Sequence, residues 1–369
     1  MKRENIHKII FLVSFWMLVA LFSIFYDYAV IHFNPDVNTN AIIKEYNFAS
    51  NLISVTVAAL LGGTLLATIE VLYFNRFFRK IPFGKSMLIK SVFYMINIVF
   101  FTSLAVLIGN SIQYNKPLIH PEIVQMNLEF MSSPRLWTIW ILWGLTVIFS
   151  LFILQISEKL GQGVLVNYLL GKYHQPREEV RIFMFLDLKS STRYAEKLGH
   201  IKYSKLIQDC FYDLTEVVSK HDAQIYQYVG DEIVLTWKKS KGLKDCHCLR
   251  TFIDYKKALI RKKDYYIKSY GLLPEFKAGL DYGQITVAEV GEIKKELAYH
   301  GDVLNSAARI QHMCNEYQSS ILLSERLKSQ LAEDKQKALS LIGKMQLKGR
   351  SKKMNVYSYK FDSMAFSDN

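Results

Sequence analysis

Two aspartates lie where apolar stretches of the chain end. Asp187 closes FMFLDL and is followed by the small polar residues of KSST, whereas Asp231 follows Gly230 in the turn of IYQYVGDEIVLTW. If the two strands are neighbours, both carboxylates meet at one edge of a sheet. With water and phosphate oxygens they complete the octahedral ligand set of Mg²⁺ or Mn²⁺. The pattern predicts a site for a divalent cation and its phosphates, although each acid alone is equally a helix cap or a solvated turn residue.

A polar pair stands on a predicted helix further along. YHGDVLNSAARIQ places Asn305 and Arg309 four residues apart, and therefore on one helical face. An exposed surface pair would explain them. The same spacing equally suits an amide that positions a sugar and a guanidinium that neutralises charge on a reacting phosphorus.

The motifs FLDLKSST, YVGDEI and GDVLNSAAR occur in this order and together resemble the class III nucleotidyl cyclases, which make cAMP or cGMP. The resemblance covers about residues 177–360. It implies that Asp187 and Asp231 bind two Mg²⁺ or Mn²⁺ ions per site, with the backbone carbonyl of Leu188 as a further ligand.

The resemblance also implies roles toward the substrate. Residues 188–192, with Thr192, would wrap the β- and γ-phosphates, and Lys348 would hold the terminal phosphates. Asn305 would orient the ribose, and Arg309 would stabilise the transition state at the α-phosphorus. In the family, the metal acids and the Asn, Arg and Lys come from different protomers, so one copy of each motif implies a homodimer with two equivalent sites.

The positions that select the purine base depart from the family pattern. Adenylate cyclases usually carry lysine and aspartate or threonine where this chain has Gln227 and Ala298, and guanylate cyclases favour glutamate and cysteine. A glutamine can pair with either purine edge, and Tyr299 or His300 is a candidate to substitute for Ala298. ATP is the expected substrate because membrane chains of bacterial type are more often adenylate cyclases, and GTP is the alternative.

Two other functions compete with this one. VGDEI resembles the GGDEF turn of diguanylate cyclases, but only one glycine precedes the acid and the Asn/Arg helix has no place in that reading. The non-enzymatic alternative is a membrane receptor or transporter whose cyclase-like domain binds nucleotide without turnover. All the positions assigned to metal, ribose and phosphate hold competent residue types, which favours an enzyme.

The elements that position these residues begin near Arg181, where short strands start to alternate with helices. Strands are predicted at RIFMFLDL, in a hairpin over 224–237, as two strands in FKAGLDYGQITVAEVG and in a final hairpin over 345–361. Helices are predicted over 191–221, 243–270 and 302–317. Helices interleaved with a largely antiparallel sheet indicate an α+β, ferredoxin-like catalytic domain over 181–369.

The N-terminal half is of another kind. The apolar runs 9–27, 52–73, 87–109 and 136–156 are each close to the ~20 residues that span hydrocarbon as a helix, which predicts a four-helix transmembrane domain over 1–156. Glu70 and Lys90 lie near the ends of their runs, so their side chains are expected to reach the interface. Residues 157–180 are expected to form a helical linker, which Pro176 stops.

Basic residues predict the orientation. They concentrate before the first run and between the second and third, which places both termini and the catalytic domain in the cytoplasm of a cell inner or plasma membrane. The net charge of +13 is then explained by basic loops and a basic domain against an anionic leaflet, without nucleic acid as a partner. The expected partners are ATP or GTP, the lipid bilayer and a second copy of the chain.

Overall fold

The computed structural model describes residues 3–33, 47–74, 77–78, 81–161, 163–346 and 353–359. The chain divides into two compact units, Met1–Lys159 and Leu160–Asn369. Lys348 lies outside the described residues.

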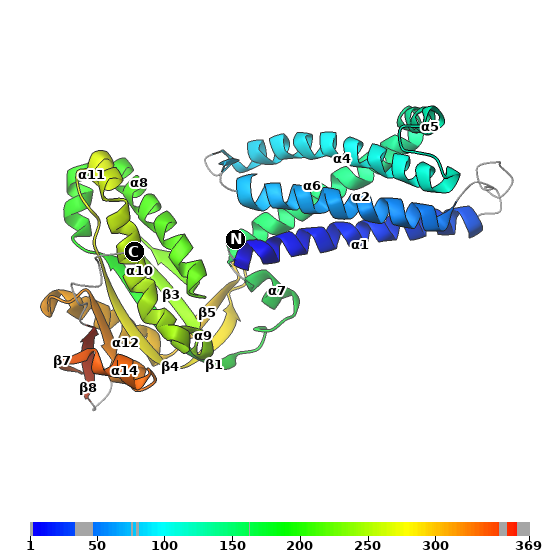
Figure 1. The fold of residues 1–369 in the computed structure, drawn as a ribbon. Coiled ribbons are helices and arrows are strands. Elements are labelled where there is room, and N and C mark those ends of the chain that lie inside the picture. The colour runs from blue at the N-terminus through cyan, green and yellow to red at the C-terminus, as the bar shows by residue number, and fades with distance from the viewer. Residues whose placement is uncertain are drawn as a thin grey trace. The chain divides into compact units, whose positions relative to one another are not determined.

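The first unit is helical (Figure 1). Its long helices are α1 (Arg3–Phe33), α2 (Phe48–Ile69), α4 (Phe83–Tyr114) and α6 (Pro134–Leu160), and a shorter amphipathic helix, α5 (Pro121–Met131), precedes α6. Four segments are long and apolar enough to cross a membrane: Asn5–Ile31, Phe48–Phe74, Phe83–Tyr114 and Leu136–Leu160. They contain the four predicted apolar runs.

Glu70 and Lys90 do not reach an interface as expected. Glu70 begins a π-helical turn, η2 (Glu70–Phe74), and its carboxylate pairs with the Lys90 ammonium of α4. The two residues are 1% and 2% exposed. The expectation failed because hydropathy shows how near a residue lies to the end of a run, but not which helix its side chain faces.

This ion pair belongs to a polar and aromatic chain that touches all four long helices. The Tyr94 hydroxyl donates to the second oxygen of Glu70, at 2.8 Å, and the Tyr94 ring packs edge-on against Trp16 of α1. The Trp16 indole in turn donates to the Ser150 hydroxyl of α6, at 3.1 Å. Polar groups inside an apolar bundle are satisfied by one another, as a low-dielectric surrounding requires.

The segment after the last membrane helix is not the continuous helix that was expected. α6 ends at Leu160, and the next helix, α7, spans only Val164–Leu169. Gly161 and Gly163 have φ values of 94° and 72°, which are left-handed and end the helical ladder. Beyond α7, Tyr173 is buried in the core of the second unit.

The second unit is built on an eight-stranded sheet (Figure 1). Its strands are β1 (Arg177–Leu188), β2 (Gln224–Val229), β3 (Glu232–Lys238), β4 (Phe276–Val290), β5 (Glu296–His300), β6 (Ile321–Ser324), β7 (Leu339–Gln346) and β8 (Lys353–Tyr359). The order is β2-β3-β1-β4-β6-β8-β7, with β5 paired to β4. Only the β4–β6 pair is parallel.

Helices cover both faces of this sheet. They are α8 (Ser191–Lys220), α9 (Lys239–Leu243), the 3₁₀ turn η4 (Lys244–Cys246), α10 (His247–Arg261), α11 (Lys263–Tyr270), α12 (Asp302–Glu316), α13 (Glu325–Lys328) and α14 (Glu333–Lys337). The even-numbered side chains of β1, such as Met184, pack with α8 and α10, whereas Phe183 and Phe185 pack with α12. Four membrane-type helices followed by a mixed α/β domain confirm the predicted fold class.

The stretch predicted as two strands is one strand, β4, of 15 residues, with β5 as its partner. Alternate residues of β4 lie under α12. At Gly279 an added Cβ would stand 2.2 Å from the backbone nitrogen of Gln311, so only glycine permits this approach. The charged residues Lys277 and Asp281 flank Gly279 on the same face of β4.

Candidate active site

The two aspartates meet at one edge of the sheet, as their sequence context predicted. β1 and β3 are antiparallel neighbours, and Asp187 lies opposite Glu232. Asp231 precedes Glu232 in the tight turn between β2 and β3, where Gly230 adopts a φ of 61°. The hairpin therefore delivers Asp231 to the end of the strand that carries Asp187.

The carboxyl groups of Asp187, Asp231 and Glu232 repel one another at this edge. Burial raises the pKa of Asp187, and the charge of Asp231 adds to the rise, whereas Lys277 and Gln311 oppose it. Burial, followed by the charges of Asp187 and Asp231, raises the pKa of Glu232 to about 7. Three carboxyl groups are thus crowded where their negative charges are poorly solvated.

The residues at this edge fit a divalent cation. The Oδ2 atom of Asp231 is buried and has no hydrogen-bond partner among the described residues, and a cation would both satisfy it and relieve the repulsion. The described part of the chain contains no set of three or more His, Cys, Asp or Glu side chains arranged to hold a metal. The protein therefore offers two carboxylates and backbone carbonyls such as that of Leu188, and the remaining ligands would be water and phosphate oxygens.

Two residues that the sequence analysis missed bind Asp187 directly. The Lys277 ammonium of β4 lies 3.2 Å from the Oδ2 atom of Asp187, and the side-chain amide of Gln311 from α12 donates to the same oxygen at 3.0 Å. Lys277 was detectable as a lone charge near the start of an apolar strand. Gln311 was not, because a glutamine on a helix has many ordinary roles.

The segment after β1 has the shape of a phosphate loop. Ser190 adopts a left-handed φ of 60°, and α8 begins at Ser191, so the first-turn amides of α8 are left without partners within the helix. Thr192 is exposed in this first turn. The segment directly follows the strand that ends with Asp187 and Leu188.

The remaining predicted catalytic residues lie elsewhere. Asn305 and Arg309 are on α12, whose buried side carries Val303, Ser306, Ala307 and Ile310, and Asn305 is exposed. Neither side chain makes a hydrogen bond or ion pair with any residue that the structure describes. Among the described residues, no hydrogen bond or ion pair joins Asn305 or Arg309 to the two aspartates.

The positions predicted to select the base lie on strands near α12. Gln227 is exposed at an irregularity in the β2–β3 pairing, and Ala298 is on β5 opposite Ala288. Tyr299 instead turns into a cluster: its ring centroid is 4.7 Å from that of Tyr226 and 5.0 Å from the Arg181 guanidinium. The partly buried ring packs against the core of the second unit, and burial raises the pKa of Tyr299 to about 12.

Known proteins share this architecture. Residues 172–360 match the family described as the adenylate and guanylate cyclase catalytic domain. The chain is 31% identical to Adenylate cyclase 2 of Rhizobium meliloti (strain 1021) over 215 residues, which cover 58% of this chain and 59% of that protein. It is 25% identical to an adenylate cyclase of Anabaena cylindrica over 183 residues, which cover 48% of this chain and 36% of that protein.

A solved structure agrees on the fold. A bacterial light-regulated adenylyl cyclase superposes with a TM-score of 0.52 at 20% identity, over 64% of this chain and 69% of that chain. The chain spans less than two thirds of the length of the curated relatives named above. Because the family match extends over about half of its residues, the chain belongs to the family of adenylate and guanylate cyclase catalytic domains.

Proposed function

We propose that this nucleotide cyclase is a membrane-anchored adenylate cyclase, which converts ATP into 3′,5′-cyclic AMP and pyrophosphate. The observation that carries the proposal is the meeting of Asp187 and Asp231 at one sheet edge, beside the free first turn of α8. Relatives named as adenylate cyclases support ATP over GTP.

The proposed reaction forms a bond between the ribose 3′-oxygen and the α-phosphorus, breaks the bond from that phosphorus to pyrophosphate, and releases the 3′-hydroxyl proton. Two Mg²⁺ or Mn²⁺ ions, held by Asp187, Asp231 and the Leu188 carbonyl, would supply activation of the hydroxyl and neutralisation of the triphosphate. Thr192 and the first-turn amides of α8 would hold the β- and γ-phosphates. Lys277 and Lys348 would add positive charge near the leaving group.

Helix α12 would supply the remaining catalytic residues. Asn305 would orient the ribose, and Arg309 would bind charge that develops on the α-phosphoryl oxygens. Gln227, Ala298 and Tyr299 would border the base. Within the described part of one chain, no hydrogen bond or ion pair joins Asn305 or Arg309 to the aspartates, which supports a homodimer in which α12 of each protomer serves the acids of the other.

The proposed placement in the cell follows from the four apolar helices and the basic residues between them. Residues 1–156 would form the membrane domain, 157–180 the transmitting segment and 181–369 the catalytic domain. Both termini would lie in the cytoplasm, where the domain meets ATP and an anionic leaflet.

The test is product formation by the purified full-length protein with Mn²⁺ and either ATP or GTP. Wild-type protein is expected to form mainly cAMP. Asp187→Asn and Asp231→Asn each remove a ligand charge and are expected to lower the rate at least ~100-fold. Asp264→Asn, an exposed acid on α11, is the matched control and is expected to leave the rate unchanged.

Each alternative has its own result. Predominant cGMP would replace ATP by GTP as the substrate. Nucleotide binding without either cyclic product would support a receptor that binds nucleotide without turnover. Full activity in the Asp187→Asn protein would contradict the proposed role of Asp187 as a metal ligand.

A further inference from the structure

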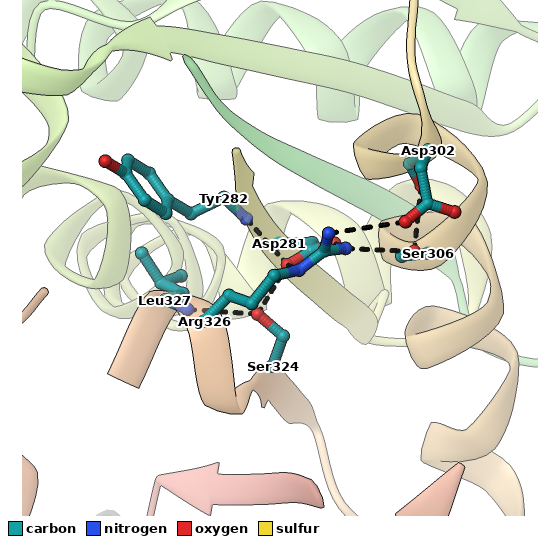
Figure 2. Close-up of polar contacts among 7 residues, drawn as sticks. All are labelled: Asp281, Tyr282, Asp302, Ser306, Ser324, Arg326 and Leu327. Carbon is teal, nitrogen blue, oxygen red and sulfur yellow. Dashed lines mark hydrogen bonds and ion pairs between the residues drawn. The ribbon is translucent and has the colours of Figure 1, made fainter. Parts of the chain in front are cut away.

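A wholly buried carboxylate stands in the middle of β4. Asp281 is 0% exposed, and its Oδ1 atom accepts hydrogen bonds from the Tyr282 backbone at 2.8 Å and from the Ser324 hydroxyl. Figure 2 shows the Arg326 guanidinium against both oxygens of this carboxylate. Burial raises the pKa of Asp281, while Arg326 and Ser324 act in the opposite direction.

The same guanidinium reaches the first turn of α12 (Figure 2). Its Nη1 atom lies 3.3 Å from the carboxylate of Asp302, and its Nη2 atom donates to the Ser306 hydroxyl at 3.2 Å. Arg326 itself is fixed by its place in α13, which Ser324 caps by accepting from the Leu327 amide. One side chain therefore joins β4, α13 and the beginning of α12.

The first turn of α12 has no side-chain N-cap, because its N-cap residue is Gly301. The contacts of Arg326 with Asp302 and Ser306 therefore tie the start of this helix to β4 and α13. Asn305 lies in this turn, and Arg309 follows one turn later. Because neither makes a hydrogen bond or ion pair with another described residue, their placement depends on the position of the helix backbone.

We propose that Arg326 is a positioning residue for catalysis, which holds the first turn of α12 against β4 so that Asn305 and Arg309 keep their reactive geometry. This inference rests on the proposed cyclase activity. It does not require Arg326 to contact the substrate. The planar fork of arginine is essential, because a lysine has one charged centre and cannot bind Asp281, Asp302 and Ser306 together.

Arg326→Lys separates positioning from simple stabilisation. The lysine retains a positive charge for buried Asp281, so the fold is preserved, but the bridge to α12 is lost. Ser306→Ala is the second variant. It removes the hydroxyl that accepts from Arg326 and donates to the Asp302 carbonyl, and alanine favours a helix. Arg250→Lys is the matched control, an exposed arginine of α10 on the opposite face of the sheet.

Kinetics give the first readout. Arg326→Lys is expected to lower kcat for cAMP formation on the order of 10- to 100-fold with little change in KM, the scale of a small misplacement of a catalytic group. In an Asn305→Ala background the same change is expected to lower kcat by a smaller factor, because only Arg309 is left to be misplaced. With Thr192→Ala, on the other half of the site, the two effects are expected to multiply.

Hydrogen exchange gives a readout that does not depend on activity. Amides of residues 302–309 are expected to exchange faster in Arg326→Lys and Ser306→Ala than in wild-type protein, and at the wild-type rate in Arg250→Lys. Unchanged exchange in both variants, or equal losses of kcat in the presence and absence of Asn305, would overturn the inference. If exchange rises while wild-type protein forms no cyclic nucleotide, the proposed function fails and the structural bridge stands.

Discussion

At the scale of single residues, Gln311 connects α12 to Asp187, a proposed metal ligand. Its amide nitrogen donates to Asp187, and its Oε1 atom is buried without a partner among the described side chains. Such a neighbour holds a metal ligand in one orientation. Gln311→Met keeps the volume but removes the donor, and is expected to weaken Mn²⁺ binding about 10- to 100-fold, as measured by electron paramagnetic resonance. His312→Ala, an exposed neighbour, is the control, and an unchanged affinity in Gln311→Met would refute this role.

The base-selecting positions give a second prediction for single residues. Gln227 can donate or accept, and Ala298 contributes no side-chain hydrogen bond. Changing them to lysine and aspartate, the residue types usual in adenylate cyclases, supplies groups that distinguish adenine from guanine. The ratio of kcat/KM for ATP over GTP is expected to rise about 10-fold or more. Gln227→Ala controls for loss of the glutamine, and an unaltered ratio in the double variant would show that these positions do not border the base.

Among the elements, two of the membrane-type helical segments are joined by the Glu70–Lys90 pair. Removing one partner leaves a buried charge uncompensated, which typically costs about 3–5 kcal/mol. Glu70→Gln and Lys90→Met are therefore each expected to lower the thermal stability of the membrane unit in detergent. The double variant Glu70→Met with Lys90→Met is expected to be less destabilised than either single variant.

The control for this pair is Thr68→Ala, because the Thr68 hydroxyl bonds only to Thr64 within its own helix. It is expected to behave as wild type. Additive losses in the double variant would mean that Glu70 and Lys90 do not act as a pair.

A second prediction for the elements concerns how stability depends on pH. His221, at the end of α8, is buried, and burial lowers its pKa. The charges of His247 and Lys220 lower this pKa further, whereas Asp254 of α10, 2.9 Å away, raises it. Below pH ~6.5 the unfolded chain takes up a proton that folded His221 binds less readily, so stability falls as the pH decreases. His221→Gln is expected to remove part of this slope, measured as protection of β3 amides relative to wild type at each pH. Parallel pH profiles would contradict it.

The sequence predicted those features that depend on local pattern. The apolar runs of the first unit and the β2–β3 hairpin followed from apolar periodicity and turn residues. The meeting of Asp187 with Asp231 was predicted on the condition that their strands are neighbours, as β1 and β3 are. The Glu70–Lys90 pair and the contacts of Gln311 and Arg326 did not, because they join segments distant along the chain. The same holds for the break after Leu160: glycines there are visible in the sequence, but their left-handed backbone is a property of the fold.

At the scale of the whole molecule, the proposed homodimer can be tested by complementation. Asp187→Ala protein lacks a metal ligand, and Arg309→Ala protein lacks the arginine supplied to the partner, so each is expected to be inactive alone. Co-expression produces some dimers in which one site has both groups intact. Cyclic nucleotide formation is therefore expected to return in part, and absence of any recovery in verified mixed dimers would contradict a site shared between protomers.

The interruption at Gly161 and Gly163 also restricts what kind of motion can pass along the chain. A continuous helix resists torsion, so turning one end turns the other. Where the hydrogen-bonded ladder stops, backbone dihedrals absorb a turn, and torque is lost within a few residues. The six-residue helix α7 and the buried Tyr173 anchor that follow can still be pulled or pushed. If the membrane-type helices receive a stimulus, it is thus expected to arrive as tension or displacement of this segment, and not as a twist.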